Sequence, residues 1–96
     1  MLSSLKGKTA WITGGKRIGL AVAQALAEQG VNIVASYRSS KKEAELAVKI
    51  SQKAGVKALA VRADASSRQD MERAVREVSK KFPHIDILVN MASISP

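Results

Sequence analysis

The chain has 96 residues, 46% of them hydrophobic, and a formal net charge of +8 from 16 Lys and Arg against 8 Asp and Glu. This length suits one domain at most, with a modest core. The chain has no cysteine and a single histidine without a partner at metal-binding spacing, so we expect neither disulfides nor a metal site. Apolar runs long enough to cross a bilayer and the apolar segment of a signal peptide are both missing, which predicts a soluble, cytoplasmic protein without a membrane partner.

The excess of positive charge raises the question of a nucleic-acid partner. Opposite charges spaced four residues apart, as in Glu45 with Lys49 and Glu72 with Arg76, are typical of solvated helix faces. The chain has only one Trp, one Tyr and one Phe, so basic stripes with interleaved aromatic residues are absent. We therefore expect no nucleic-acid partner.

The first predicted elements are a strand, Thr9 to Thr13, and a helix that begins near Ile18. Between them lies a glycine-rich turn, and Gly30 is a suitable residue to follow the end of the helix. Apolar residues at helical spacing predict the buried face of this helix as Ile18, Val22, Ala25 and Leu26.

A second strand, Asn32 to Ser36, precedes a helix that ends at Gly55. The segment from Ser40 to Glu43 has the pattern of a capping box, in which the two side chains satisfy helix N–H groups reciprocally. The buried face of this second helix is predicted to contain Leu46, Ala47 and Ile50.

A third strand, Lys57 to Arg62, leads to a helix that opens at Ser66-Ser67-Arg68-Gln69 and ends at Pro83, and a fourth strand runs from Asp86 to Asn90. The residues predicted to be buried by the third helix are Met71, Ala74, Val75, Val78 and Phe82.

The alternation of strands and helices predicts an α/β fold. A β-α-β-α-β-α-β series with right-handed crossovers forms the N-terminal half of a doubly wound, Rossmann-type parallel sheet, with strand order 3-2-1-4. Residues 1–96 are then one dinucleotide-binding portion, and an incomplete one. In this order the glycine-rich turn and the end of the fourth strand flank one crevice, at the carboxyl ends of the strands.

The glycine-rich turn itself predicts phosphate binding. Glycines allow the backbone N–H groups to approach an anion, and the following helix adds the positive end of its dipole. A P-loop is excluded because Leu20 and Ala21, rather than Lys and Ser or Thr, follow the last glycine. The G-x-G-x-x-G fingerprint matches imperfectly, because Lys16 occupies the position of its second glycine.

The turn resembles the Thr-Gly-x-x-x-Gly-x-Gly signature of short-chain dehydrogenases/reductases, and especially its pteridine-reductase-like branch. In this chain the turn is one residue shorter, and Arg17 stands where the signature has its middle glycine. The residues that carry the resemblance are Thr13, Gly14, Arg17, Ile18 and Gly19. The resemblance implies an oxidoreductase that transfers hydride between a nicotinamide cofactor and a small-molecule carbonyl or alcohol substrate, with pterin-like compounds among the candidates, and a homo-oligomer in the complete protein.

The end of the second strand predicts which cofactor is preferred. In the dinucleotide fold, an acid at this position binds the ribose 2′-hydroxyl and favours NAD(H). The segment 36–40 contains no acid, and Arg38 and Ser39 offer a cation and a hydroxyl to a 2′-phosphate, with Lys16 or Arg17 close enough to assist. We therefore expect NADP(H) rather than NAD(H). The alternative is that Arg38 is a solvated loop charge.

Two further segments have counterparts in the family. By resemblance, Asp64 accepts a hydrogen bond from the adenine amino group and the Ala65 N–H binds a ring nitrogen, although an Asp before a helix is also a common cap. The segment 86–93 resembles the family's Asn-Asn-Ala-Gly segment, with Asn90, Ala92 and Ser93 at positions that contact the cofactor. An Asn at a strand end is otherwise a simple turn residue.

The catalytic residues of the family have no counterpart here. The family uses a Ser and a helical Tyr-x-x-x-Lys pair, and the literal match of Tyr37 to Lys41 is interpreted as a coincidence because Tyr37 ends a strand. We expect this chain alone to be inactive. The alternative function is a non-catalytic nucleotide-binding or interaction module, if 96 residues is the natural length.

Overall fold

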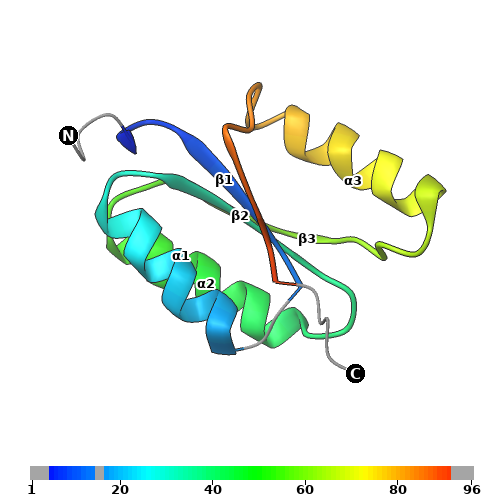
Figure 1. Ribbon diagram of the computed structural model, residues 1–96, viewed down its shortest axis with the longest axis horizontal. Coiled ribbons are helices and arrows are strands. Elements are labelled where there is room, and N and C mark those ends of the chain that lie inside the picture. The colour runs from blue at the N-terminus through cyan, green and yellow to red at the C-terminus, as the bar shows by residue number, and fades with distance from the viewer. Residues whose placement is uncertain (1–4, 15–16, 92–96) are drawn as a thin grey trace.

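The computed structural model describes residues 5–14 and 17–91, with the backbone alone for Arg17 and Ile18. Four strands alternate with three helices within these residues: β1 (Thr9–Thr13), α1 (Arg17–Glu28), β2 (Asn32–Tyr37), α2 (Lys41–Lys53), β3 (Ala58–Arg62), α3 (Arg68–Ser79) and β4 (Ile87–Asn90). All the pairings are parallel, in the order β3-β2-β1-β4 (Figure 1). The predicted α/β fold and strand order are therefore confirmed. None of these described helices is long and apolar enough to cross a membrane.

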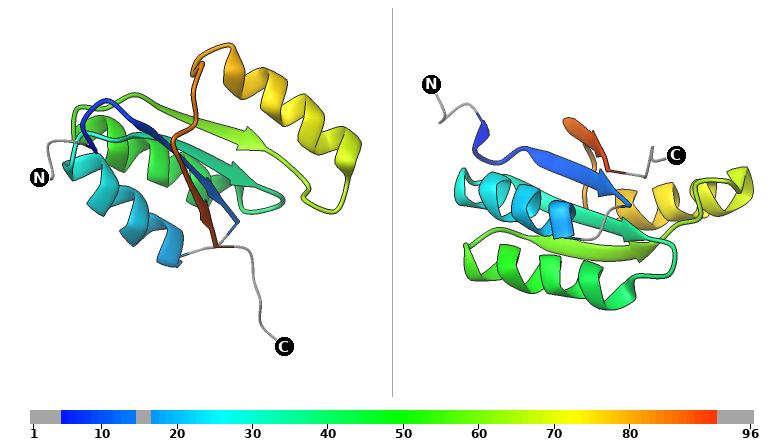
Figure 2. Two further views of the ribbon diagram at one scale, coloured as in Figure 1. Left: turned by 45° about the horizontal axis from the view of Figure 1, so that its top comes forward. Right: turned by 60° about the horizontal axis from the view of Figure 1, so that its bottom comes forward.

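Helices cover both faces of the sheet. Figure 2 shows α1 and α2 on one face and α3 on the other. Successive residues of β1 alternate between the two faces, so Ile12 packs with the core under α1 and α2, and Trp11 with the core under α3. Because both faces of the central strands are covered, their sequences are almost continuously apolar.

The cores differ in the size of the helix residues that fill them. Under α1 and α2, Ile33 and Ile12 of the sheet meet alanines from the helices: Ala23, Ala27, Ala44 and Ala47. Small helix residues let these two helices approach the branched side chains of the strands closely. Under α3, the larger Val78 packs with Trp11 and Val34, together with Phe82 from the segment that follows the helix.

The sequence prediction of the helix faces was wrong at three positions. Ala25 is exposed, Leu46 is 44% exposed and Val75 is 51% exposed. In each helix an alanine at a neighbouring position faces the sheet instead: Ala23 in α1, Ala44 in α2 and Ala74 in α3. A periodic apolar pattern locates a broad stripe, but the volume left by the sheet decides which part of that stripe is buried.

The two predicted helix caps also had different outcomes. Ser40 is the N-cap residue of α2, but its side chain makes no capping hydrogen bond, so the predicted capping box with Glu43 does not form. At α3 the cap is Ser67, whose Oγ accepts a hydrogen bond from the Asp70 N–H at 3.1 Å. The third helix therefore begins at Arg68, within the predicted opening segment 66–69.

Candidate functional site

A crevice of about 570 Å³ opens at the carboxyl ends of the strands. Of the residues predicted to bind a cofactor, it brings together Gly14, Arg38, Asp64, Ala65 and Asn90. Ser39 is exposed beside Arg38, and Gly19 lies in α1 next to a smaller cavity described below. Lys16, Ala92 and Ser93 lie outside the described residues, and Arg17 and Ile18 are the first two residues of α1.

The glycine turn is held by its neighbours at the end of β1. Gly14 has a φ of 61°, a left-handed conformation that strongly favours glycine. Its N–H donates to the Ser36 carbonyl oxygen at 3.2 Å, which ties the turn to the end of β2. The N-terminus of α1 follows three residues later, and its N–H groups and dipole favour an anion there.

The end of β4 is fastened to the end of β1. Thr13 and Asn90 are register partners, and the Thr13 Oγ1 donates to the Asn90 Oδ1 at 3.1 Å. The Met91 N–H donates to the Thr13 carbonyl oxygen at 2.8 Å, one step beyond the ladder. Asn90 thus stands at the crevice as predicted, and Thr13 is a further lining residue that the sequence reasoning assigned only to the family signature.

On the opposite side of the crevice, a tight turn follows β3. The Ser67 N–H donates to the Asp64 carbonyl oxygen at 2.9 Å, which closes a turn over residues 64–67. Inside it, the Asp64 Oδ1 accepts from both the N–H and the Oγ of Ser66, at 2.9 and 2.7 Å. Ala65 is exposed, and the hydrogen bonds of the described residues do not use its N–H.

Asp64 is a carboxylate at neutral pH. The hydrogen bonds from Ser66 hold its pKa below the ordinary value of 3.8 against the opposing effect of desolvation, and the positive charges of Arg38 and Arg62 lower the pKa further. An ionised carboxylate accepts hydrogen bonds only. The site therefore presents an acceptor at Asp64 and a cation at Arg38, on neighbouring strand ends.

Arg38 and Tyr37 line the crevice at the end of β2. Arg38 is exposed directly after β2, and the segment 36–40 contains no acidic residue. Tyr37 is half-buried, and its carbonyl oxygen accepts from the Ala63 N–H at 2.7 Å, which continues the sheet pairing into the loop. Tyr37 ends a strand and Lys41 begins a helix, so the two do not share one helix face.

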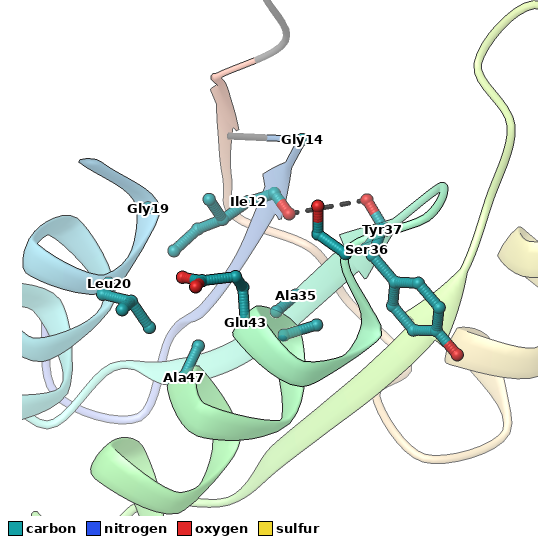
Figure 3. A pocket seen from close by; sticks show the side chains of 11 residues that line it. Ile12, Gly14, Gly19, Leu20, Ala35, Ser36, Tyr37, Glu43 and Ala47 are labelled. Carbon is teal, nitrogen blue, oxygen red and sulfur yellow. Dashed lines mark hydrogen bonds between the residues drawn. The ribbon is translucent and has the colours of Figure 1, made fainter. Parts of the chain in front are cut away.

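A smaller cavity of about 20 Å³, room for one water molecule, lies beneath the glycine turn. Figure 3 shows the Glu43 side chain reaching from α2 towards Gly19 and Leu20 of α1. Among the described residues, the buried Glu43 Oε2 has no hydrogen-bond partner. Its place near the N-terminus of α1 is favourable for a carboxylate because of the helix dipole. Sequence reasoning missed this position because it assigned Glu43 to the cap of its own helix.

Comparison with known proteins places this site in a family. The family model for short chain dehydrogenases matches residues 8–96. The chain therefore belongs to the short-chain dehydrogenase/reductase family, as its N-terminal portion, and the Rossmann-type nucleotide-binding region predicted from the sequence is confirmed.

Individual relatives cover nearly all of this chain, but only part of their own length matches. The L-rhamnose 1-dehydrogenase (NADP(+)) of Thermoplasma acidophilum is 44% identical over 92 residues, which cover 95% of this chain and 36% of that enzyme. The short-chain dehydrogenase/reductase structure from Serratia marcescens has a TM-score of 0.83 and 37% identity, over 94% of this chain and 37% of its own.

The structure of the NADH-dependent reductase A1-R′ complexed with NAD has a TM-score of 0.81 and 32% identity, over 94% of this chain and 38% of its own. This chain thus spans little more than a third of the length of these relatives.

Proposed function

We propose that the crevice binds a nicotinamide dinucleotide and prefers NADP(H) to NAD(H). Family membership leaves the choice between the two open, because the Thermoplasma relative is named for NADP(+) and the A1-R′ reductase for NADH. The observation that carries the proposal is local: Arg38 and Ser39 are exposed after β2, where an acid would favour NAD(H).

We propose the following contacts along the ligand. The pyrophosphate is bound by the glycine-rich turn and the start of α1, through Gly14, Lys16, Arg17, Ile18 and Gly19. Asp64 accepts from the adenine amino group, and the unused Ala65 N–H donates to a ring nitrogen. The segment Asn90, Ala92 and Ser93 contacts the cofactor on the β4 side.

The activity that we propose for the complete protein is hydride transfer between the nicotinamide and a carbonyl or alcohol substrate. Pterin-like compounds are among the candidate substrates, because the glycine-rich turn resembles that of the pteridine-reductase-like branch. We also propose that the complete protein is a homo-oligomer. The described residues contain no helical Tyr-x-x-x-Lys pair, so the chain by itself should not oxidise NADPH with a carbonyl or pterin substrate. Turnover by the purified chain that Tyr37→Phe abolishes would contradict this assignment.

The cofactor preference is tested by calorimetric titration of the chain with NADPH and NADH. A hydrogen bond to a charged group contributes about 1.5–3 kcal/mol, so loss of one such bond in Arg38→Ala should weaken NADPH binding about tenfold to a hundredfold. Binding of NADH, which lacks the 2′-phosphate, should change little. Lys49→Ala is the matched control, because Lys49 is an exposed cation further along α2.

Two results would overturn the preference. One is equal affinity of the unmodified chain for the two cofactors. The other is an unchanged ratio of the two affinities in Arg38→Ala, which would mean that the Arg38 guanidinium is only a solvated charge.

A further inference from the structure

Asp70 lies in the first turn of α3, outside the residues assigned to the cofactor so far. Its side chain is only 19% exposed, and its two oxygens are used by different partners. The Oδ2 accepts from the backbone N–H of Asp64 at 2.5 Å, and the Oδ1 accepts from the Arg73 guanidinium at 3.0 and 3.2 Å. The N-cap of the helix is supplied by Ser67, so this carboxylate is directed to a different segment of the chain.

Arg73 extends the same contact to the end of β3. Its Nη2 donates to the Arg62 carbonyl oxygen as well as to Asp70, and its Nη1 donates to Glu77 at 2.9 Å. The Arg62 guanidinium lies 3.7 Å from the Asp70 Oδ2. Asp70 and Arg73 therefore hold the backbone at both ends of the three-residue segment 62–64, where strand β3 turns into the crevice.

Asp64 is held in place by two different residues. Ser66 fixes the carboxylate of Asp64, and Asp70 fixes its backbone. The N–H of Asp64 and the Arg73 guanidinium hold the pKa of Asp70 below its ordinary value, so Asp70 remains an acceptor at neutral pH. A carboxylate hydrogen bond to a backbone N–H is among the strong ones, and a group held in this way is preorganised before its ligand arrives.

We infer that Asp70, supported by Arg73, is a positioning residue for the adenine end of the cofactor. It does not touch the cofactor itself. By fixing the Asp64 backbone, it keeps the Asp64 carboxylate and the Ala65 N–H in place for the base. This inference rests on the proposed function of the crevice, and it adds a second layer of residues behind that site.

The test compares two ligands that contain different parts of the cofactor. Adenosine 2′,5′-bisphosphate carries the adenine and its ribose, whereas reduced nicotinamide mononucleotide carries only the other end. Asp70→Ala should weaken binding of the bisphosphate about threefold to tenfold, the range of one net hydrogen bond, and leave the mononucleotide unchanged. Asp70→Asn retains an amide oxygen that accepts from the Asp64 N–H, so it should recover part of the loss.

Glu72→Ala is the matched control, because it removes an exposed ion pair with Arg68 in the same helix turn. A second measurement follows hydrogen exchange of the Asp64 amide, which should accelerate in Asp70→Ala and not in Glu72→Ala. If Asp70→Ala proves unfolded by circular dichroism, the comparison of Asp70→Asn with the unmodified chain serves in its place.

The outcomes separate the two proposals. If the chain binds NADPH and responds to Arg38→Ala, but Asp70→Ala and Asp70→Asn bind the bisphosphate as tightly as the unmodified chain does, the positioning role is overturned and the proposed function stands. Equal weakening of both ligands also overturns it, because a general loss of structure explains that result. If the unmodified chain binds neither NADPH nor the bisphosphate, both proposals fail together.

Discussion

The structure makes a specific prediction for Gly19, the third residue of α1. This glycine is the last one of the glycine-rich turn, and in dinucleotide folds the last glycine of the corresponding signature serves close packing of the helix on the strand. Here a Cβ at Gly19 would lie 3.7 Å from the Gly14 carbonyl oxygen and 4.0 Å from the Ile12 Cγ2, both ordinary van der Waals contacts. Gly19 is helical rather than left-handed. The fold itself therefore has room for alanine.

The expected magnitude follows from two favourable effects of Gly19→Ala. Alanine is better than glycine in a helix by about 0.8–1.0 kcal/mol, and less at the first turn. The added methyl group is buried against the end of β1, which contributes up to about 0.8 kcal/mol. We therefore expect the free energy of unfolding to rise by about 1 kcal/mol.

Urea unfolding followed by fluorescence measures this change, because the only tryptophan, Trp11, is buried in the sheet. Gly14→Ala is the contrasting variant: at a φ of 61° an alanine costs about 1–2 kcal/mol, so this variant should lose stability. A Gly19→Ala chain that is less stable than the unmodified chain by 1 kcal/mol or more would refute the reasoning, since it would mean that the methyl group has no room.

Three further predictions concern the core, the acid range and the sheet edge. Ser36→Ala removes the acceptor of the buried Trp11 Nε1–H, a 2.9 Å hydrogen bond, and should cost about 1–3 kcal/mol in urea unfolding. The pKa values of Asp64 and Asp70 are lowered in the folded chain, so these carboxylates stabilise the fold fully above pH 3.8 and lose this effect as the pH falls through the lowered values. In the variant with both residues changed to Asn, the melting temperature should therefore fall less steeply with decreasing pH in the acid range. Strand β4 has one described neighbour and exposes 69% of Leu88, so the chain should self-associate through this edge, and sedimentation should show Leu88→Lys shifted towards monomer. A strictly monomeric unmodified chain with slowly exchanging β4 amides would contradict the last prediction.

The sequence was sufficient to predict the topology, for a physical reason. Strands of four to six residues that alternate with helices leave the chain few right-handed ways to build a parallel sheet. The same reasoning placed Arg38, Asp64 and Asn90, since each directly follows or ends a strand and the carboxyl ends of parallel strands meet at one edge. Residues at strand ends are positioned by the backbone, which the apolar pattern already specifies.

Helix positions were less predictable because a side chain there has several partners within reach. Leu46 and Val75 fit the apolar period, yet alanines beside them occupy the space above the sheet. Glu43 fits a capping box, yet its carboxylate reaches towards α1 instead. In both cases the sequence pattern correctly predicts a helix. It does not specify which of the helix side chains face the sheet or the neighbouring helix, because that depends on the volumes of residues more than ten positions away.

Asp70 shows the same limit for the site. An acid three residues after a serine is a capping signal, and the Ser67 half of that signal does form. The carboxylate goes further, to the Asp64 N–H, only because the turn over residues 64–67 brings that N–H to the start of α3. Two hydrogen bonds from Ser66 to the Asp64 carboxylate stabilise this loop conformation. The residues that line the crevice can therefore be predicted from the ends of the strands. Asp70, which holds the Asp64 backbone, is found only when the loop, the strand end and the helix start are seen together.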